Sequence, residues 1–176
     1  MLLPAIDAGL METHLSTHEG KLFKLHTFYH QAKDPHLKEL LLLQIKVMKV
    51  HVPVMLSFFN PHLNEWIELP MVDELYHDLF SLPHSSDGNH SVDKPIALEA
   101  KSTATEMAQE NFTSALMMKN ENVKHVHVHM ALQQYELLKK FEKYLKHKGW
   151  AAWHLNASKK GQLETIQKYQ HLLQQA

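Results

Sequence analysis

Cysteine and arginine are both absent from this chain of 176 residues. Without cysteine there are no disulfides, no thiolate nucleophiles and no cysteine-ligated zinc or iron–sulfur sites. All 18 basic residues are lysine, and they balance 19 acidic residues to a net charge of −1. Proteins that bind nucleic acid usually carry a basic excess and use arginine forks on phosphates and guanine edges. Nucleic acid is therefore not an expected partner.

Residues that break helices are also scarce, with 5 Gly and 7 Pro in the whole chain. Hydrophobic residues make up 44% and charged residues 21%, which indicates a packed core rather than disorder. The length suits a single domain over residues 1–176. The first residues, Met1 to Asp7, have no basic segment ahead of an apolar run, so no secretory signal is expected.

The most apolar stretch, Leu40 to Phe59, is about as long as a membrane span. It contains Lys46 and Lys49 near its middle, and a lysine at that depth would be costly in lipid. We therefore interpret this stretch as a buried helix and expect no membrane span.

Four long helices are predicted from apolar residues that recur every three or four positions. The first two form a hairpin over residues 10–59, and the next two form a second hairpin over residues 93–149. Asp34-Pro35 opens the second helix, because Asp is a good N-cap and Pro suits the first turn. Gly149 ends the fourth helix. A weaker helix over residues 157–175 is expected to lie on the bundle.

The lengths of the connections predict the topology. Each hairpin is closed by a few residues, whereas the crossover of residues 60–92 is long enough to run the length of the bundle. Two antiparallel hairpins joined by one long crossover make the ferritin-like arrangement, so the predicted fold class is all-α, a ferritin-like four-helix bundle. Within the crossover, residues 72–82 are expected to form a short helix.

The two hairpins also look like a loose internal duplication. Asp34-Pro35-His36-Leu37-Lys38 and Asn120-Glu121-Asn122-Val123-Lys124 open equivalent helices 86 positions apart.

The second hairpin carries several short motifs in a characteristic order. Ala108-Gln109-Glu110-Asn111-Phe112 lies on the third helix, Asn122-Val123-Lys124 follows a polar turn, and the fourth helix closes on Lys148-Gly149-Trp150. With this order, the segment from about Ala97 to Leu173 resembles the coat F family of bacterial spore coat proteins. The resemblance implies a structural protein made in the mother-cell cytoplasm and assembled with other proteins in the spore coat. It implies no catalytic residues and no cofactor.

Common catalytic patterns are missing. A ferritin-like di-iron site needs a Glu-x-x-His pair on each of two bundle helices, and the one such pair, Glu74 with His77, falls in the crossover. Ser16 and Ser57 stand near histidines but lack the glycines of a nucleophile elbow. We therefore expect no enzyme.

Histidine is unusually abundant, with 16 residues. Three pairs have the i,i+4 spacing that lets two imidazoles reach one metal ion: His14 and His18, His26 and His30, His125 and His129. His18 and His127 fall on the inward stripes of their helices, and Glu106 and Glu110 of the third helix are candidates to join them. The candidate metal ligands are therefore His18, His127, Glu106 and Glu110.

Two functions stay open at this point. In the first, the chain is a structural protein, the polar groups only satisfy one another, and chelation has no effect on stability. The alternative is a metal-binding ferritin-like protein in which histidines replace the usual carboxylates. An inward cluster of at least three His or Glu side chains from different helices would favour the alternative.

The second helix, residues 34–59, predicts how the chain associates. It is apolar on nearly every face, which is more than one side of a bundle covers. Exposed apolar faces usually mark interfaces, so a two-fold homodimer is expected.

Overall fold

The computed structural model describes the chain except residues 1, 64, 77–91, 152–155, 171–172 and 174–176. The described residues form helices and no strand, which confirms the all-α class. The helices are α1 (Ala5–Gln31), α2 (Pro35–Phe58), α3 (Val72–Tyr76), α4 (Asp93–Met117), α5 (Glu121–His147) and α6 (Lys159–Tyr169).

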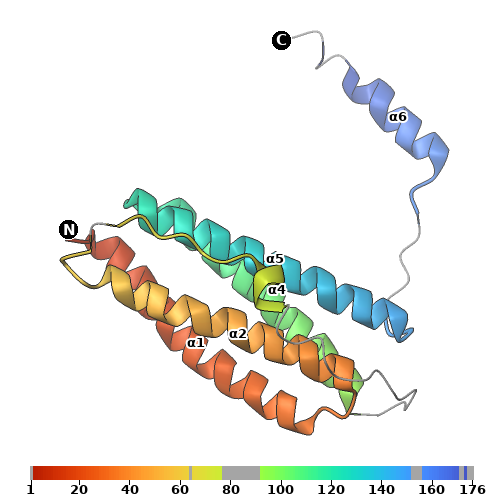
Figure 1. Cartoon of the computed structure of the whole chain (residues 1–176). Helices are drawn as coiled ribbons and strands as arrows, with labels where there is room; N and C mark the ends of the chain where they lie inside the picture. The colour runs from red at the N-terminus through yellow and green to blue at the C-terminus, as the bar shows by residue number, and fades with distance from the viewer. Residues whose placement is uncertain (1, 64, 77–91, 152–155, 171–172, 174–176) are drawn as a thin grey trace.

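Four long helices, α1, α2, α4 and α5, lie side by side (Figure 1). The α1–α2 and α4–α5 pairs are antiparallel hairpins, and α2 and α4 run in the same direction (Figure 1). After α2 the chain turns back and runs along the bundle, with α3 against both α2 and α5. Of the short helix expected over residues 72–82, α3 accounts for the first five residues, and the rest lie outside the described part of the chain.

Local signals set where the helices begin and end. The Asp34 carboxylate caps α2 by accepting a hydrogen bond from the Leu37 amide, with Pro35 as the first helical residue. The Asn120 side chain caps α5 in the same way through the amides of Asn122 and Val123. The predicted opening of α2 is therefore confirmed, whereas α1 begins at Ala5, five residues earlier than expected.

Gly149 ends α5 in the left-handed conformation, with φ 69°. The Gly149 amide donates to the Lys146 carbonyl and the Trp150 amide donates to the Leu145 carbonyl. This pair of bonds is the Schellman motif, and it confirms the predicted role of Gly149.

Gly149→Ala should lower the free energy of unfolding by about 1 kcal/mol, because a Cβ strains a left-handed residue. The added methyl would meet no atom within 4 Å, so backbone strain is the only cost. Gly149→Asn is the matched control and should cost less, because asparagine tolerates this conformation. Urea unfolding of the three proteins checks the order. Equal stabilities for glycine and alanine at this position would contradict it.

The crossover covers much of the apolar surface of α2. Val72 and Leu75 join Leu43 and Val47 of α2 in one cluster, and Ile67 and Leu69 pack against a second cluster that contains Phe58. Half of the most apolar stretch of α2 is buried, although the helix is long and apolar enough by composition to cross a membrane. The prediction of a homodimer depended on an exposed apolar surface of α2, and part of that surface is buried within the chain.

The C-terminal helix differs from expectation. α6 forms, but none of its residues is buried, and Figure 1 draws it apart from the bundle. Its apolar side chains, Leu163, Ile166 and Tyr169, are all at least half exposed. The expectation that this helix lies on the bundle was therefore wrong, because three apolar side chains offer little area to bury.

Two buried aspartates tie the hairpins together at opposite ends of the bundle. The Asp7 carboxylate of α1 accepts hydrogen bonds from the Lys119 and Asn120 amides, at 2.9 and 2.8 Å. The Asp93 carboxylate of α4 accepts from the Lys33 and Asp34 amides, at 2.8 and 3.1 Å. The two acceptors, Asp7 and Asp93, are 86 positions apart in the sequence. Their donor amides, at residues 119–120 and 33–34, are also 86 positions apart, which agrees with the predicted duplication.

Candidate functional site

Four buried histidines from three helices gather at one level of the core. His14 and His18 come from α1, His51 from α2 and His127 from α5, and none is more than 5% exposed. The ring centroids of His14 and His127 are 5.2 Å apart, and those of His18 and His51 are 5.5 Å apart. In the other half of the duplication, the positions equivalent to these four are apolar: Leu41, Ala100, Ala104 and Leu137. The histidines therefore mark one half of the bundle as chemically distinct.

Backbone carbonyls orient two of these rings. His18 Nδ1 donates to the carbonyl of His14 at 2.8 Å, and His127 Nδ1 donates to the carbonyl of Val123 at 2.9 Å. His14 is held by a 2.9 Å hydrogen bond between its Nε2 and the Ser114 hydroxyl of α4. Each ring is thus fixed by an oxygen on one of its two nitrogens.

A series of side-chain contacts runs from α1 through α2 and α5 to the crossover. His18 Nε2 faces His51 Nδ1 at 3.3 Å, and His51 Nε2 contacts Gln133 Oε1 at 2.6 Å. The Gln133 amide nitrogen then donates to the Pro70 carbonyl at 2.6 Å. This chain links α1, α2, α5 and the segment that covers them.

Burial keeps these imidazoles neutral near pH 7. Desolvation lowers the pKa of His18 to about 4, that of His51 to about 3 and that of His127 to about 4. Burial also lowers the pKa of His14, although the nearby Glu110 charge acts in the opposite direction. Neutral rings carry one proton each, so every ring has one nitrogen with a free lone pair.

Several side chains in this region retain polar atoms without a hydrogen-bond partner among the described residues. They include His14, at Nδ1, His127, at Nε2, and Gln134, at both atoms of its amide. A buried polar group left unpaired costs about 1–3 kcal/mol. The expectation that the inward polar groups satisfy one another is therefore not met in full.

The structure separates the four predicted metal ligands. His18 and His127 lie in the core, but the side chains of Glu106 and Glu110 are 48% and 43% exposed and pair with Lys21 at 3.6 and 3.2 Å. Lys21 offsets the repulsion expected between two like charges one turn apart. Within the described residues no group of three or more His, Asp or Glu side chains is placed to hold a metal ion. The carboxylates are therefore not part of the histidine cluster.

Sequence reasoning missed Gln133 and undervalued His14 and His51. His14 was visible as the partner of His18 in an i,i+4 pair, and His51 as a polar residue inside the most apolar helix. Nothing in the sequence indicates that Gln133 meets His51, because that contact depends on how α2 and α5 are aligned.

A second histidine pair lies at the surface. The rings of His125 and His129 are 4.3 Å apart, and Trp66 lies 4.9 Å from the His125 ring. His125 Nε2 contacts Glu68 Oε2 at 3.1 Å. This pair matches the expected i,i+4 spacing and is partly exposed to solvent.

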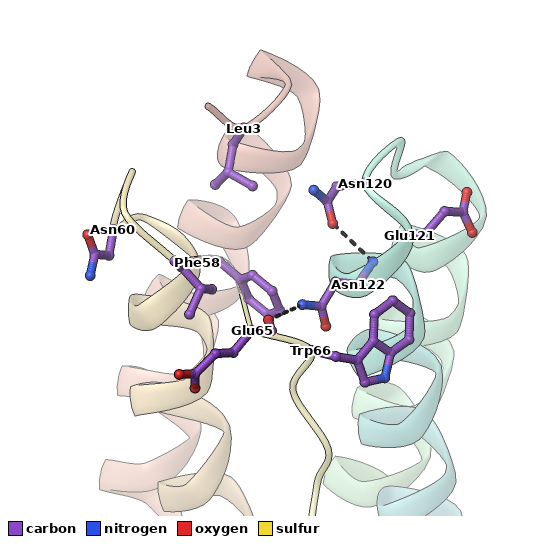
Figure 2. A pocket seen from close by; sticks show the side chains of 9 residues that line it. Leu3, Phe58, Asn60, Glu65, Trp66, Asn120, Glu121 and Asn122 are labelled. Carbon is purple, nitrogen blue, oxygen red and sulfur yellow. Dashed lines mark hydrogen bonds between the residues drawn. The ribbon is translucent and has the colours of Figure 1, made fainter. Parts of the chain in front are cut away.

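Beside it, a shallow hollow of about 400 Å³ lies between the ends of α1, α2 and α5 and the start of the crossover. Figure 2 shows the Asn122 side chain reaching the crossover at Glu65. The Asn122 amide donates to the Glu65 carbonyl and accepts from the Ile67 amide, so it holds the crossover in place. Leu3, Phe58 and Leu63 supply the apolar lining. The Asn122 amide of the hollow thus has a structural role.

Comparisons of the chain with protein-family models, curated proteins and solved structures give no match. The likeness to the coat F family therefore depends on the motifs of the second hairpin alone.

Proposed function

We propose that this chain is a non-enzymatic structural protein of the bacterial spore coat, built as a ferritin-like bundle and assembled from copies of itself and other coat proteins. Three lines of support are independent of one another. They are the arrangement of the helices, the motifs of the second hairpin and one exposed face of α1.

The helix arrangement supports the ferritin-like class. The two hairpins contact each other through three pairs of helices: α2 with α5, α1 with α4 and α2 with α4. The described part of the crossover runs back along the bundle, and α2 and α4 run in the same direction. One long crossover between two hairpins is the connection that ferritin-like folds use.

The second hairpin supports the coat assignment. The motif around Asn111 and Phe112 lies on α4, the polar turn precedes Asn122, and α5 ends at Gly149. The quoted motifs thus lie on a helix, a turn and a helix end. Since fold alone does not determine function, this support is a resemblance and requires a direct test.

The outer face of α1 supports the proposal that copies of the chain associate with one another. Six exposed residues at helical spacing contain no charge: Gly9, Thr13, Ser16, Gly20, Phe23 and Thr27. Phe23 is 77% exposed, and the hydroxyls of Thr13 and Thr27 are turned back onto the Gly9 and Phe23 carbonyls. This α1 face extends about 27 Å. This narrow stripe of small and uncharged residues is flanked by the exposed Glu12 and Glu19. Its small residues suit close contact with another helix, here one from a second copy of the chain.

Gly20→Glu should disrupt this assembly without harming the fold. A Cβ at Gly20 meets nothing within 4 Å, and glutamate favours a helix more than glycine does by up to about 1 kcal/mol. We therefore expect higher stability in urea together with weaker self-association in light scattering. Leu132→Glu, on the exposed surface of α5, is the control and should associate like the wild type. A wild-type chain that is monomeric at micromolar concentration would reject the assembly.

The coat assignment has its own test in a sporulating bacterium. A chain expressed during sporulation should remain with the washed spore coat fraction, and Leu132→Glu should behave in the same way. Gly20→Glu should stay in the soluble fraction of the mother cell. A wild-type chain found only in that soluble fraction would reject the coat assignment, whatever its state of association.

A further inference from the structure

A series of hydrogen-bonding contacts runs from the His14 carbonyl to the Pro70 carbonyl. One contact in this series has no proton to share. The Pro70 carbonyl only accepts, so the Gln133 amide nitrogen must donate to it and Gln133 Oε1 must face His51. The opposite amide orientation would place two acceptor oxygens 2.6 Å apart. His51 Nε2 therefore carries a proton and donates it to Gln133 Oε1.

The other end of the chain is fixed in the same way. The carbonyl of His14 accepts, so His18 Nδ1 carries the proton of that ring. Each neutral imidazole has a single N–H, which leaves His18 Nε2 and His51 Nδ1 both without a proton. These two nitrogens face each other at 3.3 Å, which is the longest distance in this series of contacts. Two nitrogens without protons thus lie next to each other inside the core.

A third nitrogen of the same kind lies at this level. His127 Nδ1 donates to the Val123 carbonyl, so His127 Nε2 has a free lone pair, and it has no partner among the described residues. All three rings are oriented by an oxygen on the opposite nitrogen. That is the usual arrangement around histidines that ligate metals, where the second N–H is held by a carbonyl or a similar acceptor.

The distance between the facing nitrogens fits a tetrahedral metal ion. With Zn–N bonds of about 2.0–2.1 Å, two ligands at the tetrahedral angle lie about 3.3–3.4 Å apart. The gap between His18 Nε2 and His51 Nδ1 is 3.3 Å. Because burial lowers the pKa of both rings, their lone pairs are free near neutral pH.

We propose that His18 Nε2 and His51 Nδ1 form a two-nitrogen clamp for a zinc-like divalent cation, and that His127 Nε2 is the third ligand. Imidazole ligands suit Zn²⁺, Ni²⁺ and Cu²⁺ more than Mg²⁺ or Ca²⁺. The three side chains do not yet converge on one point, so binding includes a turn of the His127 ring toward the clamp. With this site, chelation should lower the stability of the metal-bound chain, whereas the sequence led us to expect no effect.

Metal binding is tested on the full chain without an affinity tag, with Co²⁺ and Zn²⁺ as probes. We expect one Co²⁺ per chain, with the strong visible absorption of a tetrahedral site, and its displacement by Zn²⁺. Zn²⁺ at 100 times its dissociation constant should raise the folding equilibrium constant about 100-fold, because it binds only the native state. A chain that binds neither ion in the core would overturn the proposal.

Variants locate the site. His51→Leu and His18→Leu should abolish the tetrahedral Co²⁺ spectrum, and His127→Leu should weaken binding. The double variant of His125→Ala and His129→Ala removes the surface pair and should leave that spectrum unchanged. Binding that is lost only in this surface variant would show an adventitious site and refute the proposal.

Imidazole ¹⁵N spectra of the wild-type chain give a readout that needs no variant to fold. Zn²⁺ should shift His18 Nε2, His51 Nδ1 and His127 Nε2, and should leave Nδ1 of His18 and of His127 protonated. A metal-free chain at pH 7 in which His18 and His51 share an extra proton would contradict the inference, because no pair of lone pairs would then exist.

Discussion

Acidification should unfold this protein between about pH 6.5 and pH 4, because buried neutral histidines favour the folded state only while they remain unprotonated. Histidine has a pKa near 6.5 in an unfolded chain. Burial lowers the pKa of His18 and His127 to about 4 and that of His51 to about 3. Within this window the unfolded state binds more protons than the folded state. Stability is therefore complete above pH 6.5 and is lost as the pH falls.

The expected loss is large. Each of the three histidines contributes a slope of about 1.4 kcal/mol per pH unit and a loss of about 2 kcal/mol at pH 5. Together they remove about 6 kcal/mol, which is comparable with the whole stability of a small domain. His14 acts in the same direction, since burial outweighs the Glu110 charge that faces it, and the Lys21 charge also lowers its pKa. The Asp7 charge opposes the shift of His127 but does not cancel it.

Urea unfolding at a series of pH values, followed by circular dichroism with a chelator present, measures this slope. The wild type should take up about three protons on unfolding near pH 5. His51→Leu should take up about one fewer, and His51→Leu combined with His18→Leu about two fewer. Uptake of less than one proton by the wild type would contradict neutral buried histidines.

The sequence predicted well the features that depend on neighbouring residues. Asp34-Pro35 and Gly149 mark helix ends because capping acts within one turn. The apolar periodicity located the four long helices, and the lengths of the connections placed them in two hairpins joined by a crossover. Each of these signals acts over a few residues or depends only on chain length.

Features that depend on how helices are aligned with one another could not be predicted in the same way. Glu110 lies one residue from Asn111, yet Asn111 is buried and Glu110 pairs with Lys21 at the rim. A rotation of α4 by about 100°, one residue in helical terms, would exchange them. The contact of His51 with Gln133 likewise depends on the alignment of α2 and α5. The hydrogen bond from Gln133 to the Pro70 carbonyl depends on the path of the crossover.

The role of Asp7 also depends on how the two hairpins are arranged, so the sequence alone could not predict it. An acidic residue in the first turn of a helix is ordinary, because it interacts favourably with the helix dipole. Its additional role of binding the start of α5 appears only when the two hairpins are brought together. The 86-residue spacing between Asp7 and Asp93 was the available signal in the sequence.

Asp7→Asn and Asp93→Asn should each lower the free energy of unfolding by about 3 kcal/mol. Each carboxylate is buried and accepts two backbone hydrogen bonds at the start of a helix in the other hairpin. An asparagine keeps one acceptor oxygen but places an amide N–H against the second backbone N–H. The change removes a charge-assisted bond worth about 1.5–3 kcal/mol and leaves two donors facing each other. It also removes a negative charge from helix N-termini, which adds to the loss.

The two substitutions should be additive, because they act at opposite ends of the bundle and share no partner. Asp73→Asn is the matched control: Asp73 is 78% exposed and pairs with Lys140 at 3.0 Å, and exposed ion pairs contribute at most about 1 kcal/mol. Urea unfolding of the single and double variants measures the three effects. If Asp7→Asn costs no more than Asp73→Asn, the carboxylate does not hold the hairpins together. If the double variant loses much less than the sum, the two ends are coupled and the bundle does not close independently at each end.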